Sequence, residues 1–429
     1  MKSVIRIVVF LFILFLSRVE AEQPPQAKGS LNRAVPVQRV VAALRKGAER
    51  IEIRDKCVNS KLTWVEVDYY DEDYPLTVNV VSVKQPKPDK IIYLLTSSSL
   101  NFRSSFFTPV ESSMAKYLAD KGYLVVGITP REDNVPLDAD QSVMADWGIE
   151  QHRKDIREII ELVQKAIKKP YELLGHSLGA ICALDYAAVY SEEDFRKVIL
   201  LDLPSFDPVL QQDKIQNATL AYDAYNQLMV SGVYSEHSVD DFKLLLMVSA
   251  LYPDIDSGVS RDFVGLPGNF TYNGLLHFSL MYTSFLPGII TDLTGLPQEW
   301  PMVLGHAVGY YDFALDPAQD DFGLLFTDVD KLRLLSVEIG SGSAPLALAK
   351  DYTSAIAGLN GYQINYEDVD ESLIWINGQL GMGAQTYGAD LIRQAGNTDV
   401  KVIIAPFYGH IDVISSDTAA EDIWQHFAE

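Results

Sequence analysis

The chain has little positive charge and almost no cysteine. Its 429 residues include 35 Lys and Arg against 58 Asp and Glu, which gives a formal net charge of −23. A nucleic-acid backbone would repel such a surface, so we expect no nucleic-acid partner. The two cysteines, Cys57 and Cys182, are too few for a disulfide framework, and we expect no disulfide between them.

Apolar runs long enough to span a membrane are missing. The longest run, residues 8–16, is too short for the hydrocarbon core, which needs about 20 apolar residues. It follows Lys2 and Arg6 and precedes Val19 and Ala21, which put apolar and small residues at the two positions that a signal peptidase reads, an order typical of a secretory signal peptide. We therefore predict a signal peptide over 1–21, a secreted or periplasmic protein and no stable membrane span, with an N-terminal anchor as the alternative.

Motifs that bind metals or dinucleotides are missing as well. The sequence contains no His-Glu-x-x-His, no cysteine pair at ligand spacing and no Gly-x-Gly-x-x-Gly after a predicted strand. We therefore expect no metal and no other cofactor. A hydrophobic fraction of 48% and a charged fraction of 22% are typical of a folded soluble protein, with room for one large α/β domain plus an insertion, or for two domains.

The most informative stretch that is present is residues 171–180. A short apolar run ends in Gly-His-Ser-Leu-Gly, with its serine at Ser177, and small residues at helical spacing follow. A serine on a sharp strand-to-helix turn projects its hydroxyl beyond the sheet edge, and the glycines on either side relieve crowding. The helix that follows directs its free N–H groups to the same point. The pattern therefore predicts that Ser177 is a nucleophile.

Strand and helix patterns alternate around Ser177, which indicates a parallel sheet with right-handed crossovers. The residues between 22 and 61 carry apolar side chains at helical spacing and suggest one outer helix. We expect strands at 63–69, 76–83, 91–95, 123–128, 171–176, 198–201, 372–377 and 400–405. We expect further helices at 111–121, 155–168, 346–357, 386–394 and 419–427.

The Gly-His-Ser-Leu-Gly turn, in this order of elements, resembles the nucleophile elbow of the α/β-hydrolase family, in the form common among its esterases and lipases. The resemblance implies an α/β-hydrolase fold, with a mostly parallel central sheet and helices on both faces. It implies that 22–204 and 332–429 form the core. The apolar, helix-rich residues 205–331 then correspond to the large helical cap or lid that many members insert after the sixth strand.

A serine nucleophile needs a base, and a third group to hold the tautomer of that base. His410 follows the last predicted strand in Gly-His-Ile-Asp, which resembles the catalytic-histidine loop of the family, and we interpret Asp412 as structural. The family's acid usually follows the strand before it, where this chain has Gly381. We choose Asp202, at the end of the strand after the elbow. The alternatives are Glu338 or another carboxylate on the side of the predicted lid, and no acid at all.

The resemblance also implies an oxyanion hole made by two backbone N–H groups. One belongs to Leu178, directly after the nucleophile. The other belongs to the loop after the strand at 91–95, which in the family often begins with His-Gly. Here the loop begins with Thr96, and we name Ser97 or Ser98 as the donor.

We therefore predict a secreted serine hydrolase that cleaves carboxylic esters, with hydrophobic acyl or aryl groups, through an acyl-enzyme on Ser177. Its expected partner is a small-molecule or lipid ester. An aminopeptidase or amidase, an acyltransferase and a non-catalytic binding protein on the same scaffold remain as alternatives. The sequence predicts no oligomeric state.

Overall fold

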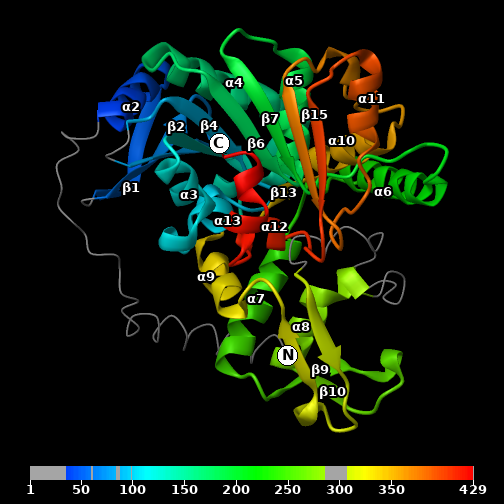
Figure 1. Ribbon diagram of the computed structural model, residues 1–429. Helices are drawn as coiled ribbons and strands as arrows, with labels where there is room; N and C mark the ends of the chain where they lie inside the picture. The colour runs from blue at the N-terminus through cyan, green and yellow to red at the C-terminus, as the bar shows by residue number, and fades with distance from the viewer. Residues whose placement is uncertain (1–34, 59–60, 84–86, 98, 286–306, 429) are drawn as a thin grey trace.

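A central sheet with helices around it forms the larger part of the molecule, and a smaller lobe lies below it (Figure 1). The computed structural model describes residues 35–58, 61–83, 87–97, 99–285 and 307–428. The predicted signal peptide over 1–21 and the candidate donor Ser98 lie outside the described residues. Among the described helices, none is both long and apolar enough to cross a membrane.

The central sheet has nine strands in the order β1-β2-β3-β5-β4-β6-β7-β14-β15. From β5 to β15 all neighbours are parallel, whereas β1, β2 and β3 pair antiparallel and β3 pairs antiparallel with β5. The prediction of a mostly parallel sheet is thus confirmed. The strands are β1 (Arg50–Val58), β2 (Leu62–Tyr70), β3 (Leu76–Val83), β4 (Lys90–Leu95), β5 (Tyr123–Thr129), β6 (Tyr171–His176), β7 (Phe195–Leu201), β14 (Ser372–Gly378) and β15 (Val400–Ala405).

The expected single helix between 22 and 61 is wrong in its second half. Helix α2 (Val35–Gly47) packs its apolar face on the core and ends at a glycine, and β1 begins three residues later. Ile51 and Ile53 alternate with charged residues, which is the period of a strand. This segment pairs with the free edge of β2, and that partner cannot be recognised from the local sequence.

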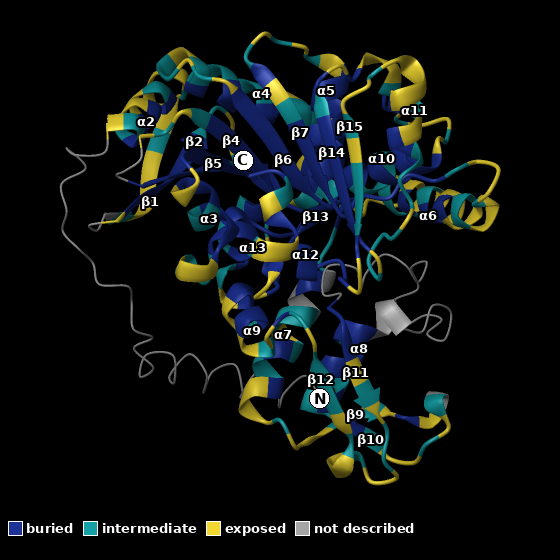
Figure 2. Cartoon of the chain, in the orientation of Figure 1, coloured by how far each residue is buried: buried dark blue, intermediate teal, exposed yellow. Residues whose placement is uncertain are grey.

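Helices cover both faces of the sheet, as predicted. On one face α2, α4, α5, α10 and α11 share a hydrophobic cluster with the inward side chains of the strands, and on the other face α3 and α12 do so. The bounds are α3 (Met114–Asp120), α4 (Ile149–Ala166), α5 (Leu178–Val189), α10 (Leu346–Ala357), α11 (Tyr387–Ala395), α12 (Asp412–Ser415) and α13 (Ala419–Asp422). Figure 2 shows the strands largely buried, with exposed residues on the outer helices α2, α4 and α11.

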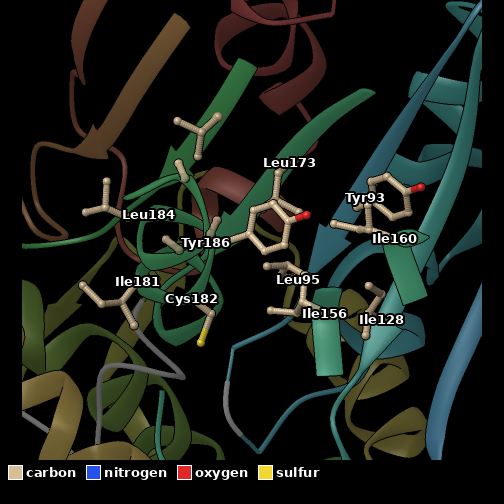
Figure 3. Close-up of a cluster of buried hydrophobic side chains, with 14 of the residues drawn as sticks. Tyr93, Leu95, Ile128, Ile156, Ile160, Leu173, Ile181, Cys182, Leu184 and Tyr186 are labelled. Atoms are coloured by element: carbon tan, nitrogen blue, oxygen red, sulfur yellow. The ribbon is translucent and has the colours of Figure 1, made fainter. Parts of the chain in front are cut away.

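Alternation along the strands and helical spacing along the helices together build this core. Figure 3 shows Tyr93 of β4 and Leu173 of β6 among side chains from α4 and α5. Ile156 and Ile160 stand one helical turn apart on α4 and are buried, as is Ile181 on α5. Because this packing fixes β4, β6 and α5 relative to one another, it also fixes the turn that carries Ser177.

The chain between β7 and β14 leaves the sheet. Helix α6 (Gln212–Val230) packs on α10, whereas α7 (Ser238–Leu251), α8 (Tyr272–Phe285) and short strands form the lobe below, next to α9 (Val329–Glu338) (Figure 1). The prediction missed these strands because they have two to five residues. In the lobe they are β9 (Asp256–Ser260), β10 (Asn269–Thr271), β11 (Gly309–Asp312) and β12 (Asp321–Leu324), whereas β8 (Ser235–Glu236) and β13 (Ala344–Pro345) pair with each other next to α10. That 205–331 caps the site stays a prediction.

Candidate active site

Ser177 stands on a tight turn between β6 and α5. Its φ of 56° and ψ of −120° place a non-glycine residue in a sparsely populated, strained region. A side chain at Gly175 would put its Cβ 2.1 Å from the carbonyl oxygen of Gly179. A Cβ at Gly179 would lie 2.4 Å from the carbonyl oxygens of Leu95 and Thr96. The turn can close only because residues 175 and 179 are glycines, and this is why the motif requires glycine at both positions.

The structure brings Asp202 and His410 together from positions 208 residues apart. Asp202 directly follows β7, and His410 lies in the loop after β15. His410 Nδ1 is 2.5 Å from Asp202 Oδ2, and both side chains are fully buried. The N–H of Ser177 donates to the carbonyl of Leu201 at 2.9 Å, so the serine's main chain is held beside the residue that precedes Asp202.

Backbone amides at the end of β14 hold the Asp202 carboxylate. Oδ1 accepts from the N–H of Gly378 at 2.7 Å, and the N–H of Met382 lies 3.2 Å from both oxygens. Burial would raise the pKa of Asp202, but the hydrogen bonds from His410 and from these amides outweigh burial and lower the pKa. The carboxylate is therefore ionised at neutral pH, and it accepts the proton that His410 carries on Nδ1.

Gly381, the place where the family's acid was expected, lies against Asp202. A Cβ at Gly381 would stand 2.4 Å from Asp202 Oδ2. The space that an acid from β14 would use is thus occupied by a carboxylate from β7. Glu338, the alternative acid, does not reach His410. Its Oε2 instead pairs with Arg103 Nε at 2.8 Å.

Asp412 uses its carboxylate to fasten the His410 loop to the chain that returns from the lobe. Oδ2 accepts from the N–H groups of Val308 and Gly409, at 2.9 and 3.0 Å. Oδ1 accepts from the Thr327 hydroxyl at 2.6 Å. These contacts agree with the structural interpretation of Asp412.

The ring of His176 lies against the ring of His410. The two ring centroids are 4.6 Å apart, and His176 Nε2 is 3.0 Å from the carbonyl oxygen of His410. Burial and the neighbouring His410 lower the pKa of His176 to about 3. The sequence places His176 next to Ser177, but it cannot predict the contact with His410, which lies 234 positions further along the chain.

His410 Nε2 is buried and has no hydrogen-bond partner among the described residues. This nitrogen is the one that Asp202 leaves unused. A buried polar atom without a partner is uncommon and calls for an explanation. The His410 ring lies 4.6 Å from the ring of His176, which directly precedes Ser177.

The oxyanion candidates sit next to the elbow. Helix α5 begins at Leu178, and the first N–H groups of a helix have no acceptor within it. Leu95 pairs with Gly175 in the sheet, and the carbonyl oxygens of Leu95 and Thr96 lie against Gly179, so the loop that carries Ser97 begins beside the first turn of α5. Ser97 is fully buried, and in the described part of the chain the hydroxyls of Thr96 and Ser97 have no partner.

Neither a disulfide nor a metal cluster is found in the part of the chain that the structure describes. Cys57 lies in β1 and Cys182 is buried in α5, and no bond joins the two sulfur atoms. Among the described residues, no group of three or more His, Cys, Asp or Glu side chains is placed to hold a metal ion.

Comparison with known proteins identifies the fold of the chain. No protein-family model and no curated protein sequence matches the chain. A crystal structure from Sulfolobus solfataricus, assigned as a lipase, superimposes with a TM-score of 0.60 at 18% identity, over 88% of this chain and 97% of that one. A thermostable carboxyl esterase from Bacillus coagulans gives a TM-score of 0.42 at 14% identity, over 86% of this chain and 98% of that one. The likeness to the Sulfolobus structure shows that this chain has the α/β-hydrolase fold, as the sequence predicted.

Proposed function

We propose that the protein is a serine hydrolase that cleaves carboxylic esters through an acyl-enzyme on Ser177. The observation that carries the proposal is the buried pair of His410 and Asp202, in which Nε2 of His410 has no hydrogen-bond partner among the described residues. The His410 ring lies 4.6 Å from the ring of His176, the residue directly before the strained Ser177. A structural ion pair would not require an unpartnered imidazole nitrogen, because such a nitrogen is costly when buried.

In the first half of the proposed reaction, Ser177 Oγ attacks the ester carbonyl carbon while His410 Nε2 takes the serine proton. Asp202 holds the hydrogen on Nδ1, so that Nε2 is the basic nitrogen, and it stabilises the imidazolium that forms. The N–H groups of Leu178 and of Ser97 bind the oxyanion. The carbon–oxygen bond to the alcohol then breaks, and the alcohol leaves with the proton from Nε2.

In the second half, water replaces the alcohol. His410 Nε2 takes a proton from the water as it attacks the acyl carbon of the ester on Ser177. The tetrahedral intermediate collapses, the bond to Ser177 Oγ breaks, and Nε2 returns the proton to that oxygen. An acyltransferase would differ only in using another hydroxyl or amine in place of this water.

An ester substrate is favoured over the alternatives by two considerations. The Sulfolobus neighbour is assigned as a lipase, and the insertion of this chain is rich in apolar side chains. A non-catalytic binding protein is disfavoured because Asp202 lies against Gly381, where the family's acid was expected, and its carboxylate contacts His410 Nδ1. Export stays part of the proposal through the signal-peptide pattern at 1–21.

The proposal is tested by labelling the purified protein with a fluorophosphonate and by measuring hydrolysis of nitrophenyl esters of increasing chain length. Ser177→Ala and His410→Ala should abolish labelling, and Asp202→Asn should lower kcat by about 10³- to 10⁴-fold by favouring the wrong tautomer. Glu338→Gln is the matched control and should leave kcat unchanged. A folded wild-type protein that is neither labelled nor active would refute the proposal.

A further inference from the structure

A second histidine lies against His410 and has no part in the proposed reaction. His176 is the last residue of β6 and directly precedes Ser177. Its ring lies 4.6 Å from the ring of His410, at an angle of 36° between the planes. Its Nε2 is 3.0 Å from the carbonyl oxygen of His410. Since a carbonyl only accepts, Nε2 carries the hydrogen and donates it.

This hydrogen bond fixes a ring hydrogen of His176 on Nε2, and the low pKa of the group keeps the ring neutral at pH 7. Nδ1 is then the unprotonated nitrogen, and it has no partner in the described part of the chain. The charged and titratable groups that act on His176 are His410 and Asp202, and burial together with His410 lowers the pKa of His176 to about 3. When His410 becomes an imidazolium, no second cation beside it competes for the carboxylate.

The His410 loop needs such an anchor. His410 lies outside the strand ladder, in the loop between β15 and α12. Its side chain is tied at Nδ1 to Asp202, and its neighbour Gly409 is tied through the main chain to Asp412. The main-chain carbonyl of His410 itself accepts from His176 Nε2.

We propose that His176 is a positioning residue for His410. Its donated N–H fixes the main chain of His410, and its ring supports the imidazole, so that Nδ1 stays on Asp202 and Nε2 stays available to Ser177. The inference rests on the proposed function, because it assigns His176 a task in the same site.

Two substitutions separate the ring of His176 from its donor. His176→Phe keeps an aromatic ring and removes the N–H, whereas His176→Gln keeps an N–H at a similar reach. His152→Phe is the matched control, because His152 is also buried and also bonds a main-chain carbonyl, that of Gly148 at 2.8 Å. Each variant is compared by melting temperature, by kcat and KM, by the pH profile of kcat/KM, and by the NMR signal of the His410 Nδ1–H.

His176→Phe should lower kcat about 10-fold, the size expected for one lost hydrogen bond, with little change in KM. The acid limb of the profile should move to lower pH, because a loosened imidazolium is held less well by Asp202, and the Nδ1–H signal should shift. His176→Gln should restore most of the activity. His152→Phe should lower the melting temperature and leave the profile and the signal as in the wild type.

Wild-type kcat, profile and Nδ1–H signal in His176→Phe would overturn the inference, as would equal changes in His152→Phe. Failure of the proposed function is distinguishable, because the wild type would then resist fluorophosphonate labelling. In that case the NMR signal alone decides: a shift in His176→Phe supports the positioning role, and an unchanged signal refutes it.

Discussion

At the scale of single residues, the candidate site depends on the position of the Asp202 carboxylate and not on the strand that carries it. Asp202 has a φ of 51°, uncommon for a residue with a side chain, and this turns its carboxylate across the end of β14. The amides of Gly378 and Met382 receive it there. Gly381 has no side chain to compete for the same space.

Gly381→Ala should therefore disturb the acid. The added Cβ would lie 2.4 Å from Asp202 Oδ2, so the carboxylate must move away from His410. A displacement of about 1 Å in a catalytic group can cost roughly 100-fold, and we expect kcat to fall by 10- to 100-fold. Steady-state kinetics with a nitrophenyl ester measures this, with circular dichroism as the check on folding. Wild-type kcat in the folded variant would contradict the expected collision.

Moving the acid should be possible. A Cβ added at Gly381 would lie 2.4 Å from Asp202 Oδ2. This is about the distance that separates the Cβ of an aspartate from its own carboxylate oxygens, so an aspartate at 381 could place an oxygen where Asp202 Oδ2 now lies. In Asp202→Ala/Gly381→Asp, the new carboxylate should reach His410 Nδ1 and recover at least 10-fold of the kcat lost in Asp202→Ala, within the 10⁴-fold that a triad acid can supply. Comparing the single and double variants measures the recovery. A double variant no better than Asp202→Ala would show that β14 cannot deliver the acid.

At the scale of elements, Asp412 connects the His410 loop to the lobe through Thr327. Thr327→Val removes the hydroxyl and leaves a buried carboxylate short of a donor, so unfolding should become easier by about 1–3 kcal/mol. Because Asp412 also holds Gly409, kcat should fall as well. Thr327→Ser keeps the hydroxyl and should lose less of both. Urea unfolding measures the stability of the two variants, and ester kinetics measures their kcat. Equal losses of stability and kcat in Thr327→Val and Thr327→Ser would contradict a role for the hydroxyl.

The sequence predicted the elements with a local signal and missed those that depend on a partner. Continuous apolar runs at β4, β6 and β7 were sufficient, because strands buried on both faces have few polar positions. Strand β1 was mistaken for helix because its identity depends on the edge of β2. The three choices left open for the acid could not be resolved from sequence, since the pairing of Asp202 with His410 depends on how β14 lies between β7 and β15.

Contacts between side chains distant in sequence were equally hidden. The Gly-x-Ser-x-Gly spacing identified the turn, because its two glycines are required where the main chain comes close. Gly175 lies against Gly179, and Gly179 lies against the end of β4. Nothing in the sequence records that His176 bonds the carbonyl of His410. Such a contact follows only once both strand ends share one edge of the sheet.

At the scale of the whole molecule, two buried histidines impose opposite dependences of stability on pH. Burial would lower the pKa of His152, but the carboxylate of Glu132, 3.1 Å from its Nε2, outweighs burial and raises the pKa to about 9. Its stabilisation is complete below the unfolded pKa near 6.5 and is lost as pH rises through 9. His176, with a pKa of about 3, has the opposite effect: stability falls as pH drops from 6.5 towards 3.

His152→Gln should consequently flatten the alkaline side of the stability curve. In the wild type, this one proton contributes a slope of at most about 1.4 kcal/mol per pH unit between pH 6.5 and 9. Urea unfolding at several pH values, for the wild type and the variant, isolates that slope. The acid side should be similar in the two proteins, because His176 is untouched. An unchanged alkaline slope in His152→Gln would show that other groups set it.

The reach of Asp202 from one strand end to the next also bears on how such proteins are found in genomes. Recovery of activity in Asp202→Ala/Gly381→Asp would mean that either strand end can supply the acid, so that its place in the chain could change during divergence while the geometry of the base stays fixed. A pattern search keyed to an acid after the strand that ends at Gly378 would discard this chain. A search keyed to a carboxylate at that point in space would retain it.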